Sequence, residues 1–405
     1  MRVRIEKGTA RGLLRIPCSK STAHRYILSA SLAEGVSTLC GVDLNEDISA
    51  TIDCVRAFGA KISVEGDQVS IVGVGGRQSY IGSDLPLLNC RESGSTLRFM
   101  IPIALLFGGG IFRGSERLVS RGIGIYEELF GSFADIKIGQ KEIMVKGRLT
   151  ADSYRVRGNV SSQFISGLMF ALPMLEADSR IEIVLPFESR GYVDMTVDTL
   201  SRFGVKIERP TETSFFVHGG QRYQPIHAKM EGDWSQAAFY YGFNALGGEV
   251  KLEGLDNNSF QGDRVCVSLF EKLKKGFAEI DISDCPDLGP VLFAVASALH
   301  GARFTGTGRL AIKESNRAEV MAKELLKFGA DITVAENTVE IAPCTLHAPS
   351  EPLQGHGDHR VVMALAVLAA QFGADIEGAE AIDKSYPAFF DDLGRVGLEM
   401  KKYHA

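Results

Sequence analysis

Apolar residues along this chain are spaced in two alternating ways. Stretches such as residues 193–202 and 317–327 carry apolar residues three and four positions apart, which predicts amphipathic helices. Shorter stretches alternate apolar and polar residues around a turn, as at residues 61–72, which predicts paired strands. The chain is therefore expected to be a mixed α/β protein.

A short motif of the form Phe-Gly-Ala/Val-x-Ile marks the passage from helix to strand. Its glycine is a common helix stop because it tolerates left-handed backbone. Three close copies and three variants occur, at residues 58–62, 203–207 and 328–332 and at residues 133–136, 277–280 and 396–400. The motif can also be read as an ordinary helix-to-strand junction, but the pattern around it recurs as well. One such unit cannot bury its own apolar face, so six units predict two similar domains of three repeats.

No long linker rich in Pro, Gly or Ser separates the predicted domains. The repeats therefore place the boundary, with a first domain at residues 19–228 and a second at residues 229–405 joined by residues 1–18. The chain would cross between them twice, near residues 18–20 and 227–232. A chain of 405 residues is also too long for one ordinary core.

Composition narrows the class of protein. Hydrophobic residues make up 45% of the chain and charged residues 23%, as in globular proteins. The net charge of −6 argues against a general nucleic-acid surface, which needs a basic face. The longest apolar run, residues 361–370, is about half the ~20 residues that a membrane span needs, so we expect a buried helix there.

The seven cysteines are scattered and contain no Cys-x-x-Cys pair. This pattern fits reduced thiols better than a disulfide framework or a zinc site. The N-terminal residues lack the apolar stretch of a signal peptide. These features predict a cytoplasmic protein.

Candidate chemistry is concentrated in five short polar clusters, each next to an apolar stretch of helical period. They occupy residues 19–25, 92–98, 161–163, 313–317 and 357–360. Small hydroxyl residues in the first turn of a helix leave N–H groups exposed, where the helix dipole adds positive potential. Lys and Arg, which suit phosphate and carboxylate, stand beside them. Helix capping would explain one such cluster, whereas five predict a protein that holds small anions.

The clusters and the repeat together make the chain resemble the 5-enolpyruvylshikimate-3-phosphate synthase family over essentially its whole length. The matching segments occur in the family's order, at residues 19–25, 93–98, 121–124, 161–163, Asp287, 313–317, 358–360 and Lys384. The resemblance implies an α/β fold of two similar domains, each of three βαβαββ repeats in the inside-out α/β barrel of enolpyruvyl transferases, with an interdomain cleft. It further implies a monomer that uses no metal and no organic cofactor.

The family transfers the enolpyruvyl (carboxyvinyl) group of phosphoenolpyruvate to the 5-hydroxyl of shikimate 3-phosphate, through a tetrahedral intermediate, and releases phosphate. This reaction belongs to the shikimate pathway of aromatic amino-acid biosynthesis. The resemblance places around phosphoenolpyruvate Lys20, Gly94, Arg121, Gln163, Glu314, Arg317, Arg360 and Lys384. It places around shikimate 3-phosphate Ser21, Arg25, Ser161, Ser162, Gln163, Ser189, Asp287 and Lys313.

Catalysis by addition and elimination needs a base for the attacking hydroxyl and an acid for the methylene carbon. We assign Asp287 as the candidate base and Glu314 as the candidate acid, with Lys20 and Lys384 assisting charge and proton movement. Several anionic groups on the two substrates would require several cations and helix N-termini, which the five clusters supply.

Simpler interpretations exist for single motifs. Lys313, Glu314 and Arg317 have the spacing of an ordinary helix-surface pairing. Ser161 and Ser162 have the composition of a helix cap. The group of His356, Asp358 and His359 resembles metal ligands, but no further ligand stands at a recognisable spacing.

Some positions depart from the family pattern. Cys18 stands where a glycine is more common, Gly122 where a proline is common after Arg121, and Arg309 where some members have asparagine. The version of the glycine motif at residues 92–98 also differs from that of other members, which puts glyphosate sensitivity in doubt. None of these departures changes the expected reaction.

Two other functions compete with this one. UDP-N-acetylglucosamine enolpyruvyl transferases have a similar fold and the same donor, but usually carry a reactive cysteine in a loop that corresponds to residues 112–124, and this chain has none there. A non-catalytic repeat protein, such as a nucleic-acid clamp, would be expected to show a basic face. Contraction with shikimate 3-phosphate would separate an enzyme from such a clamp.

Overall fold

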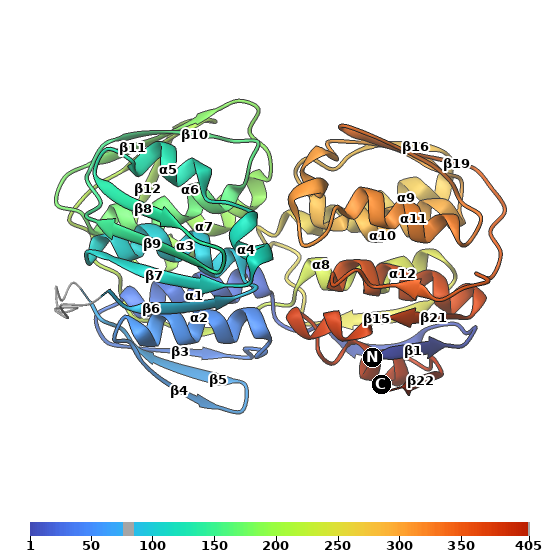
Figure 1. Cartoon of the computed structure of the whole chain (residues 1–405). Helices are drawn as coiled ribbons and strands as arrows, with labels where there is room; N and C mark the ends of the chain where they lie inside the picture. Colours follow the sequence, from blue (N-terminus) through green and yellow to red (C-terminus); the bar gives the residue numbers. More distant parts are fainter. Residues whose placement is uncertain (76–84, 404–405) are drawn as a thin grey trace. The chain divides into compact units, whose positions relative to one another are not determined.

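Two compact units make up the fold in a computed structural model that describes residues 1–75 and 85–403. The middle unit is Cys18–Glu231, and the terminal unit combines Met1–Pro17 with Gly232–Ala405. The chain therefore passes from one unit to the other twice. Both chain ends belong to the terminal unit, where the N and C marks are neighbours (Figure 1).

Three four-stranded sheets of identical plan form the middle unit. In each, the first two strands are parallel and the remaining neighbours are antiparallel. In sheet order they are β14 (His227–Lys229), β3 (Val36–Cys40), β5 (Gln68–Val72) and β4 (Lys61–Glu65); β6 (Leu87–Arg91), β7 (Gly109–Gly114), β9 (Glu142–Gly147) and β8 (Ala134–Ile138); and β10 (Ser153–Arg157), β11 (Ser179–Val184), β13 (Ser214–Val217) and β12 (Ile207–Thr211).

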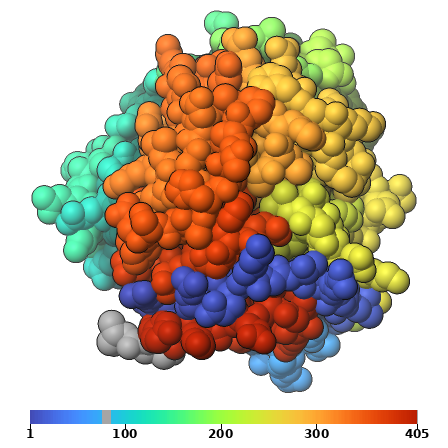
Figure 2. All heavy atoms as spheres, turned by 90° about the vertical axis from the view of Figure 1, so that its right-hand side faces the viewer, coloured from blue at the N-terminus to red at the C-terminus, as the bar shows by residue number. Residues whose placement is uncertain are grey.

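The terminal unit has two four-stranded sheets of the same plan and one smaller sheet. Its third sheet has only two strands, which run parallel. In sheet order the strands are β20 (Leu353–Gln354), β21 (Ala374–Glu377), β1 (Arg2–Ile5) and β22 (Met400–Tyr403); β16 (Ala278–Asp281), β17 (Ala302–Thr305), β19 (Thr338–Ala342) and β18 (Asp331–Ala335); and β15 (Glu249–Glu253) with β2 (Arg11–Arg15). Strand β1 thus lies between strands from the chain's other end, as Figure 2 shows in blue against red.

Helices pack against these sheets in both units (Figure 1). Those of the middle unit are α1 (Lys20–Leu32), α2 (Glu46–Ala57), α3 (Gly94–Leu106), α4 (Glu116–Ser120), α5 (Gly124–Phe130), α6 (Ser162–Ala171) with the 3₁₀ turn η1 (Leu172–Met174), and α7 (Arg190–Arg202). Those of the terminal unit are α8 (Trp234–Ala245), α9 (Cys266–Lys275), α10 (Gly289–Ala298), α11 (Arg317–Leu326), α12 (His359–Phe372) and α13 (Phe389–Arg395), with 3₁₀ turns η2 (Gly262–Val265), η3 (Pro286–Leu288), η4 (Gly308–Ile312) and η5 (Ala379–Lys384).

Each unit has its own apolar core. Helices α1, α3 and α6 of the middle unit are buried along most of their length, and so is α12 of the terminal unit. The apolar run at residues 361–370 is therefore a buried helix, as predicted, and each of its side chains is at most 1% exposed. The outer helix α7 instead shows the predicted amphipathic pattern, with Val193 and Leu200 buried and Arg202 exposed. No helix in the described parts of the chain is both long and apolar enough to cross a membrane.

The repeated motif has the predicted role at most of its copies. Gly59 and Gly329 follow helices α2 and α11 with φ of +99° and +84°, a conformation that favours glycine. Antiparallel hairpins then follow at four copies, as β4–β5, β8–β9, β12–β13 and β18–β19. The two other copies differ: β16 leads through η3 into α10, and β22 pairs with β1.

Candidate active site

Helix α1 begins the polar cluster of the middle unit. The Ser19 hydroxyl accepts a hydrogen bond from the Thr22 N–H, so Ser19 caps the helix. Lys20 is the first helical residue, and its Nζ lies 2.8 Å from Oδ2 of Asp47 in the first turn of α2. Both side chains are 14% exposed, so the ammonium group is partly desolvated and still accessible.

Arg25 lies one turn further along α1 and is 2% exposed. Its guanidinium donates to the carbonyl of Ser21, the Tyr192 carbonyl and the Thr196 hydroxyl, at 2.7 to 2.8 Å. Burial lowers the pKa of Arg25 to about 10, so it is charged at neutral pH. No carboxylate pairs with it among residues 1–75 and 85–403, and a buried cation without an acidic partner favours an anion.

Two further guanidinium groups meet at the start of α3, where Ser93 is the cap. A Cβ atom on Gly94 would lie 3.0 Å from Nη1 of Arg98 and 3.2 Å from Nη1 of Arg121. A larger residue at this position would require both guanidinium groups to shift by a few tenths of an ångström from the helix N-terminus. Two guanidinium groups and a helix dipole at one point form a strong site for a carboxylate or phosphate.

Gln163 connects this point to α6. Its Oε1 accepts from Nη1 of Arg98 at 2.7 Å, and its Nε2 donates to the Ser95 hydroxyl at 2.9 Å. The Ser161 hydroxyl accepts from the Gln163 N–H, so the capping interpretation of Ser161 is confirmed. Ser162 is the first residue of α6 and is buried.

Ser189 has backbone conformation that serine seldom adopts. It precedes α7 with φ of 54° and ψ of 42°, and it is 2% exposed. A non-glycine residue in the left-handed region is strained, and such strain is concentrated at functional sites. The backbone conformation of Ser189 therefore makes it a candidate functional residue independently of the family resemblance.

A buried chain of hydrogen bonds joins the helices under this cluster. His24 Nδ1 lies 2.7 Å from the Thr51 hydroxyl, which lies 2.7 Å from the hydroxyl of Thr96. The Thr96 hydroxyl donates in turn to Ser93 at 2.7 Å. Burial, with the charges of Lys20 and Arg25, holds the pKa of His24 well below its usual range. The chain therefore links neutral groups of α1, α2 and α3.

Removing the middle hydroxyl of this chain should destabilise the protein. Thr51→Val keeps the shape but leaves buried partners unsatisfied, at a cost of about 1–3 kcal/mol. We expect a lower urea midpoint than for Thr199→Val. Within the described part of the chain, the buried Thr199 hydroxyl donates only to the Met195 carbonyl of its own helix. Equal midpoints for the two variants would contradict the importance of the chain.

The terminal unit carries a second cluster, centred on Arg317 at the start of α11. This guanidinium is 1% exposed and contacts three carboxylates, Asp287 at 2.8 Å, Glu314 at 2.5 Å and Asp358 at 2.9 Å. Burial would lower the pKa of Arg317, but the three acids raise it above its ordinary value. Arg317 is therefore a permanent cation that holds three acids together.

Asp287 of η3 is the acid with the most cationic partners. Its carboxylate lies 3.1 Å from Lys313 Nζ, 2.8 Å from Arg317 Nη1 and 3.1 Å from Arg360 Nη2. Burial alone would raise the pKa of Asp287, but Arg360, Lys313 and Arg317 together hold it well below its usual range. With these partners in place, Asp287 is ionised and only weakly basic.

The remaining predicted residues surround this network. Arg360, in the first turn of α12, also donates to the Ser235 hydroxyl, which bonds to the α8 cap Asp233. Burial lowers the pKa of Lys313 despite its contact with Asp287. Lys384, at the end of η5, donates to the Gly357 carbonyl at 3.0 Å in the loop before α12.

The structure divides the predicted residues between the two units. Lys20, Ser21, Arg25, Gly94, Arg121, Ser161, Ser162, Gln163 and Ser189 belong to the middle unit, and Asp287, Lys313, Glu314, Arg317, Arg360 and Lys384 to the terminal unit. Sequence reasoning missed Asp47 and did not assign roles to Arg98 and Asp358, although both lie in the quoted motifs. For Asp47 the available signal was its place after Asn45 in an acidic first helical turn. Among the described residues, no group of three or more His, Cys, Asp or Glu side chains is arranged to hold a metal ion.

Comparison with known proteins shows the family of the chain. Residues 6–393 match the family described as EPSP synthase (3-phosphoshikimate 1-carboxyvinyltransferase). A 3-phosphoshikimate 1-carboxyvinyltransferase of Clostridium kluyveri is 39% identical over 97% of this chain and 96% of its own length. One of Clostridioides difficile is 36% identical over 97% of each chain.

Solved structures support the fold. An EPSP synthase from Acinetobacter baumannii superposes with a TM-score of 0.80 at 22% identity, covering 99% of this chain and 100% of that one. The enolpyruvyl transferase NikO from Streptomyces tendae superposes with a TM-score of 0.78 at 14% identity, covering 100% and 99%. The predicted α/β fold is therefore confirmed. The match over nearly the whole chain, with curated relatives at 36–39% identity, places the chain in the EPSP synthase family.

Proposed function

We propose that this protein transfers the carboxyvinyl group of phosphoenolpyruvate to the 5-hydroxyl of shikimate 3-phosphate and releases phosphate. The observation that carries the proposal is the pair of guanidinium groups at Gly94, beside the α3 N-terminus, in a chain of this family. That arrangement suits a small, multiply charged anion such as phosphoenolpyruvate. The rival sugar-nucleotide transferase and the non-catalytic clamp have no comparable support.

The binding roles proposed for single residues divide by substrate. Phosphoenolpyruvate would contact Lys20, Gly94, Arg121, Gln163, Glu314, Arg317, Arg360 and Lys384. Shikimate 3-phosphate would contact Ser21, Arg25, Ser161, Ser162, Gln163, Ser189, Asp287 and Lys313. Arg25 suits the acceptor phosphate because its buried charge has no acidic partner in the described chain. Besides contacting phosphoenolpyruvate, Arg317 would also have a positioning role, because its guanidinium holds three carboxylates in place.

The chemistry assigned to Asp287 requires a change in its partners. A carboxylate held by three cations is a poor base. Anionic groups of the substrates would compete for Lys313 and Arg360, and weaker pairing with either cation would raise the pKa of Asp287 toward its usual range. Each substrate would in this way contribute to activating the base, and the activation would be greatest when both substrates are present.

The proposed reaction then proceeds in two balanced steps. In the addition, the acceptor 5-oxygen bonds to the substituted carbon of phosphoenolpyruvate, its proton passes to Asp287, and Glu314 donates a proton to the methylene carbon. In the elimination, the new methyl group returns a proton to the Glu314 carboxylate and the carbon–carbon double bond re-forms. The carbon–oxygen bond to phosphate breaks with its electron pair on the departing phosphate, which takes up the proton held by Asp287. Lys20 and Lys384 would stabilise negative charge on the phosphoenolpyruvate carboxylate and on the departing phosphate.

Glu314 can be tested separately from its contact with Arg317. Glu314→Gln keeps an oxygen that can accept from Arg317 Nη2, but it has no proton to donate to carbon. We expect kcat to fall about 100-fold with nearly unchanged acceptor binding. Glu319→Gln, an exposed change in the first turn of α11, is the matched control. A folded Glu314→Gln protein with normal kcat would remove the residue from the proton transfer.

The function itself is tested by phosphate release from phosphoenolpyruvate. Shikimate 3-phosphate and UDP-N-acetylglucosamine are supplied as acceptors in separate reactions. Release with shikimate 3-phosphate alone is the expected result. Release only with the sugar nucleotide would move the assignment to the other transferase, and release with neither from folded protein would overturn the proposal.

Two further points complete the proposal. We expect the enzyme to act in the cytoplasm, in keeping with seven cysteines that are not joined by disulfides. We also expect a monomer, because all proposed binding residues come from one chain. Light scattering on the eluted protein, with and without substrates, measures the oligomeric state directly.

A further inference from the structure

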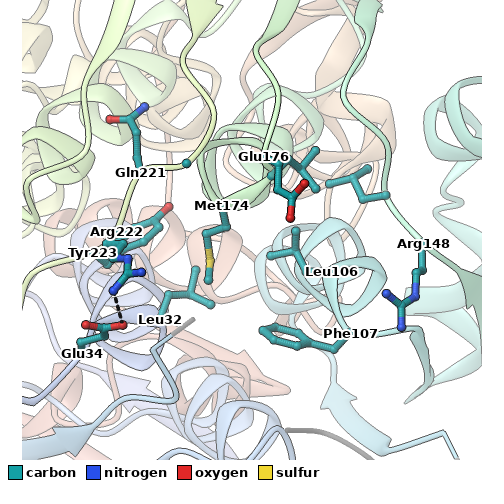
Figure 3. A pocket seen from close by; sticks show the side chains of 13 residues that line it. Leu32, Glu34, Leu106, Phe107, Arg148, Met174, Glu176, Gln221, Arg222 and Tyr223 are labelled. Atoms are coloured by element: carbon teal, nitrogen blue, oxygen red, sulfur yellow. Dashed lines mark hydrogen bonds and ion pairs between the residues drawn. The ribbon is translucent and has the colours of Figure 1, made fainter. Parts of the chain in front are cut away.

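A pocket of about 450 Å³ lies in the middle unit, away from the residues discussed so far. It is formed where three buried helical segments end, with Leu32 at the end of α1, Leu106 at the end of α3 and Met174 at the end of η1 after α6 (Figure 3). Its volume is within the range of small-molecule sites.

The pocket is distinct from the proposed active-site residues. Lys20 and Gly94 are the first residues of α1 and α3, and each of these helices has 13 residues. At a rise of 1.5 Å per residue, the two ends of such a helix are about 18–20 Å apart. The pocket and the middle-unit cluster are thus at opposite ends of the same helices.

Apolar side chains make up about half of the residues that line the pocket. Leu32, Leu149 and Tyr223 are buried, and Phe107 and Met174 are half-buried around the same space. The Tyr223 hydroxyl does not face a ligand, because it donates to the Phe170 carbonyl at 2.7 Å. A ligand must therefore bring an apolar body to gain from burial here.

Four charged side chains lie at the rim of the pocket, and two of them form an ion pair with each other. Arg222 Nη1 lies 3.3 Å from Glu34 Oε1, so these two charges neutralise each other. Arg148 and Glu176 also line the pocket, and neither makes a hydrogen bond or ion pair within residues 1–75 and 85–403. In Figure 3 the Glu176 carboxylate is directed toward Leu106, and Arg148 lies on the side away from the Glu34–Arg222 pair.

These charges define the chemistry of a ligand. A simple anion would meet Arg148 but also Glu176 and the negative ends of the helices. A simple cation would leave Arg148 without a partner. We propose that this pocket binds an α-amino acid with an apolar side chain, its ammonium group at Glu176 and the helix ends and its carboxylate at Arg148.

The test uses L-leucine with compounds that each lack one feature. Ligand-observed NMR titrations of the full chain compare L-leucine with 3-methylbutylamine, which lacks the carboxylate, and 4-methylpentanoate, which lacks the ammonium group. Glycine lacks the apolar side chain. We expect saturable binding of L-leucine and at least about tenfold weaker binding of the other three.

Variants of the protein complete the test. Arg148→Gln and Glu176→Gln change exposed side chains, so folding should be kept, and each should weaken L-leucine binding at least about tenfold. Arg155→Gln, an exposed change on β10, should leave it unchanged. Absence of saturable L-leucine binding, equal binding of 3-methylbutylamine, or normal binding to both pocket variants would each overturn the proposal.

Discussion

Replacing Asp287 by asparagine is expected to lower kcat about 1,000-fold or more, with a much smaller change in either KM. The asparagine amide has the shape of the carboxylate but cannot accept the proton of the attacking hydroxyl. Steady-state rates of phosphate release with each substrate varied in turn measure this split. Asp284→Asn, an exposed change three residues earlier in the chain, is the matched control.

The Asp287→Asn variant also distinguishes a role of Asp287 as the base from a role in balancing the charges of nearby cations. Asp287 is close to three cations, so its loss leaves Lys313, Arg317 and Arg360 repelling one another with less compensation. We therefore expect a lower Tm for the variant, with recovery in added sulfate, because an anion can take the place of the carboxylate. A variant with normal kcat and raised KM for both substrates would show that Asp287 only organises cations and is not the base.

Replacing Arg25 by alanine is expected to raise KM for shikimate 3-phosphate about 100-fold or more and to change KM for phosphoenolpyruvate far less. Losing one partner of a buried, hydrogen-bonded charge pair costs about 2–5 kcal/mol in binding, which corresponds to this range. Initial rates over a wide range of acceptor concentration give the value. An unchanged KM from folded protein would remove Arg25 from the acceptor site.

Folding is a concern for this variant because Arg25 also bonds to α7. The guanidinium donates to Thr196 and to the Tyr192 carbonyl, so alanine leaves both without this partner. Arg25→Lys, which keeps a charge, should raise KM less than alanine while leaving similar hydrogen bonds unmade. Arg202→Ala, an exposed change on α7, controls for loss of an arginine.

Local patterns were sufficient to predict much of this protein from its sequence. Helix periodicity, glycine stops such as Gly59 and hydroxyl caps such as Ser19 depend on neighbours within a few residues, and these predictions are confirmed. The boundaries of the repeats were less predictable. The motif at residues 277–280 differs from most of its relatives, because β16 is not followed by a hairpin and instead forms a parallel pair with β17.

Long-range pairing decided what the local pattern could not. Strand β22 takes β1 as its partner, from residues almost 400 positions earlier in the chain. No periodicity in residues 396–403 indicates that partner. Helix propensity and turn chemistry act over a few residues, whereas strand pairing depends on which edges the folded unit leaves open.

For the candidate site residues too, the sequence predicted some properties and only the tertiary structure decided others. Their identity and order in the sequence predicted which residues bind anions, and the family match supports that prediction for the chain as a whole. Only the tertiary structure decided their electrostatic state, since Arg25 meets Thr196 across 171 positions and Arg360 meets Asp287 across 73. A pKa depends on burial and on charges a few ångströms away, and those neighbours come from distant parts of the chain. The sequence therefore determined which ionisable groups are present, and packing determined that Arg25 is a buried cation and that Asp287 is a carboxylate held by three cations.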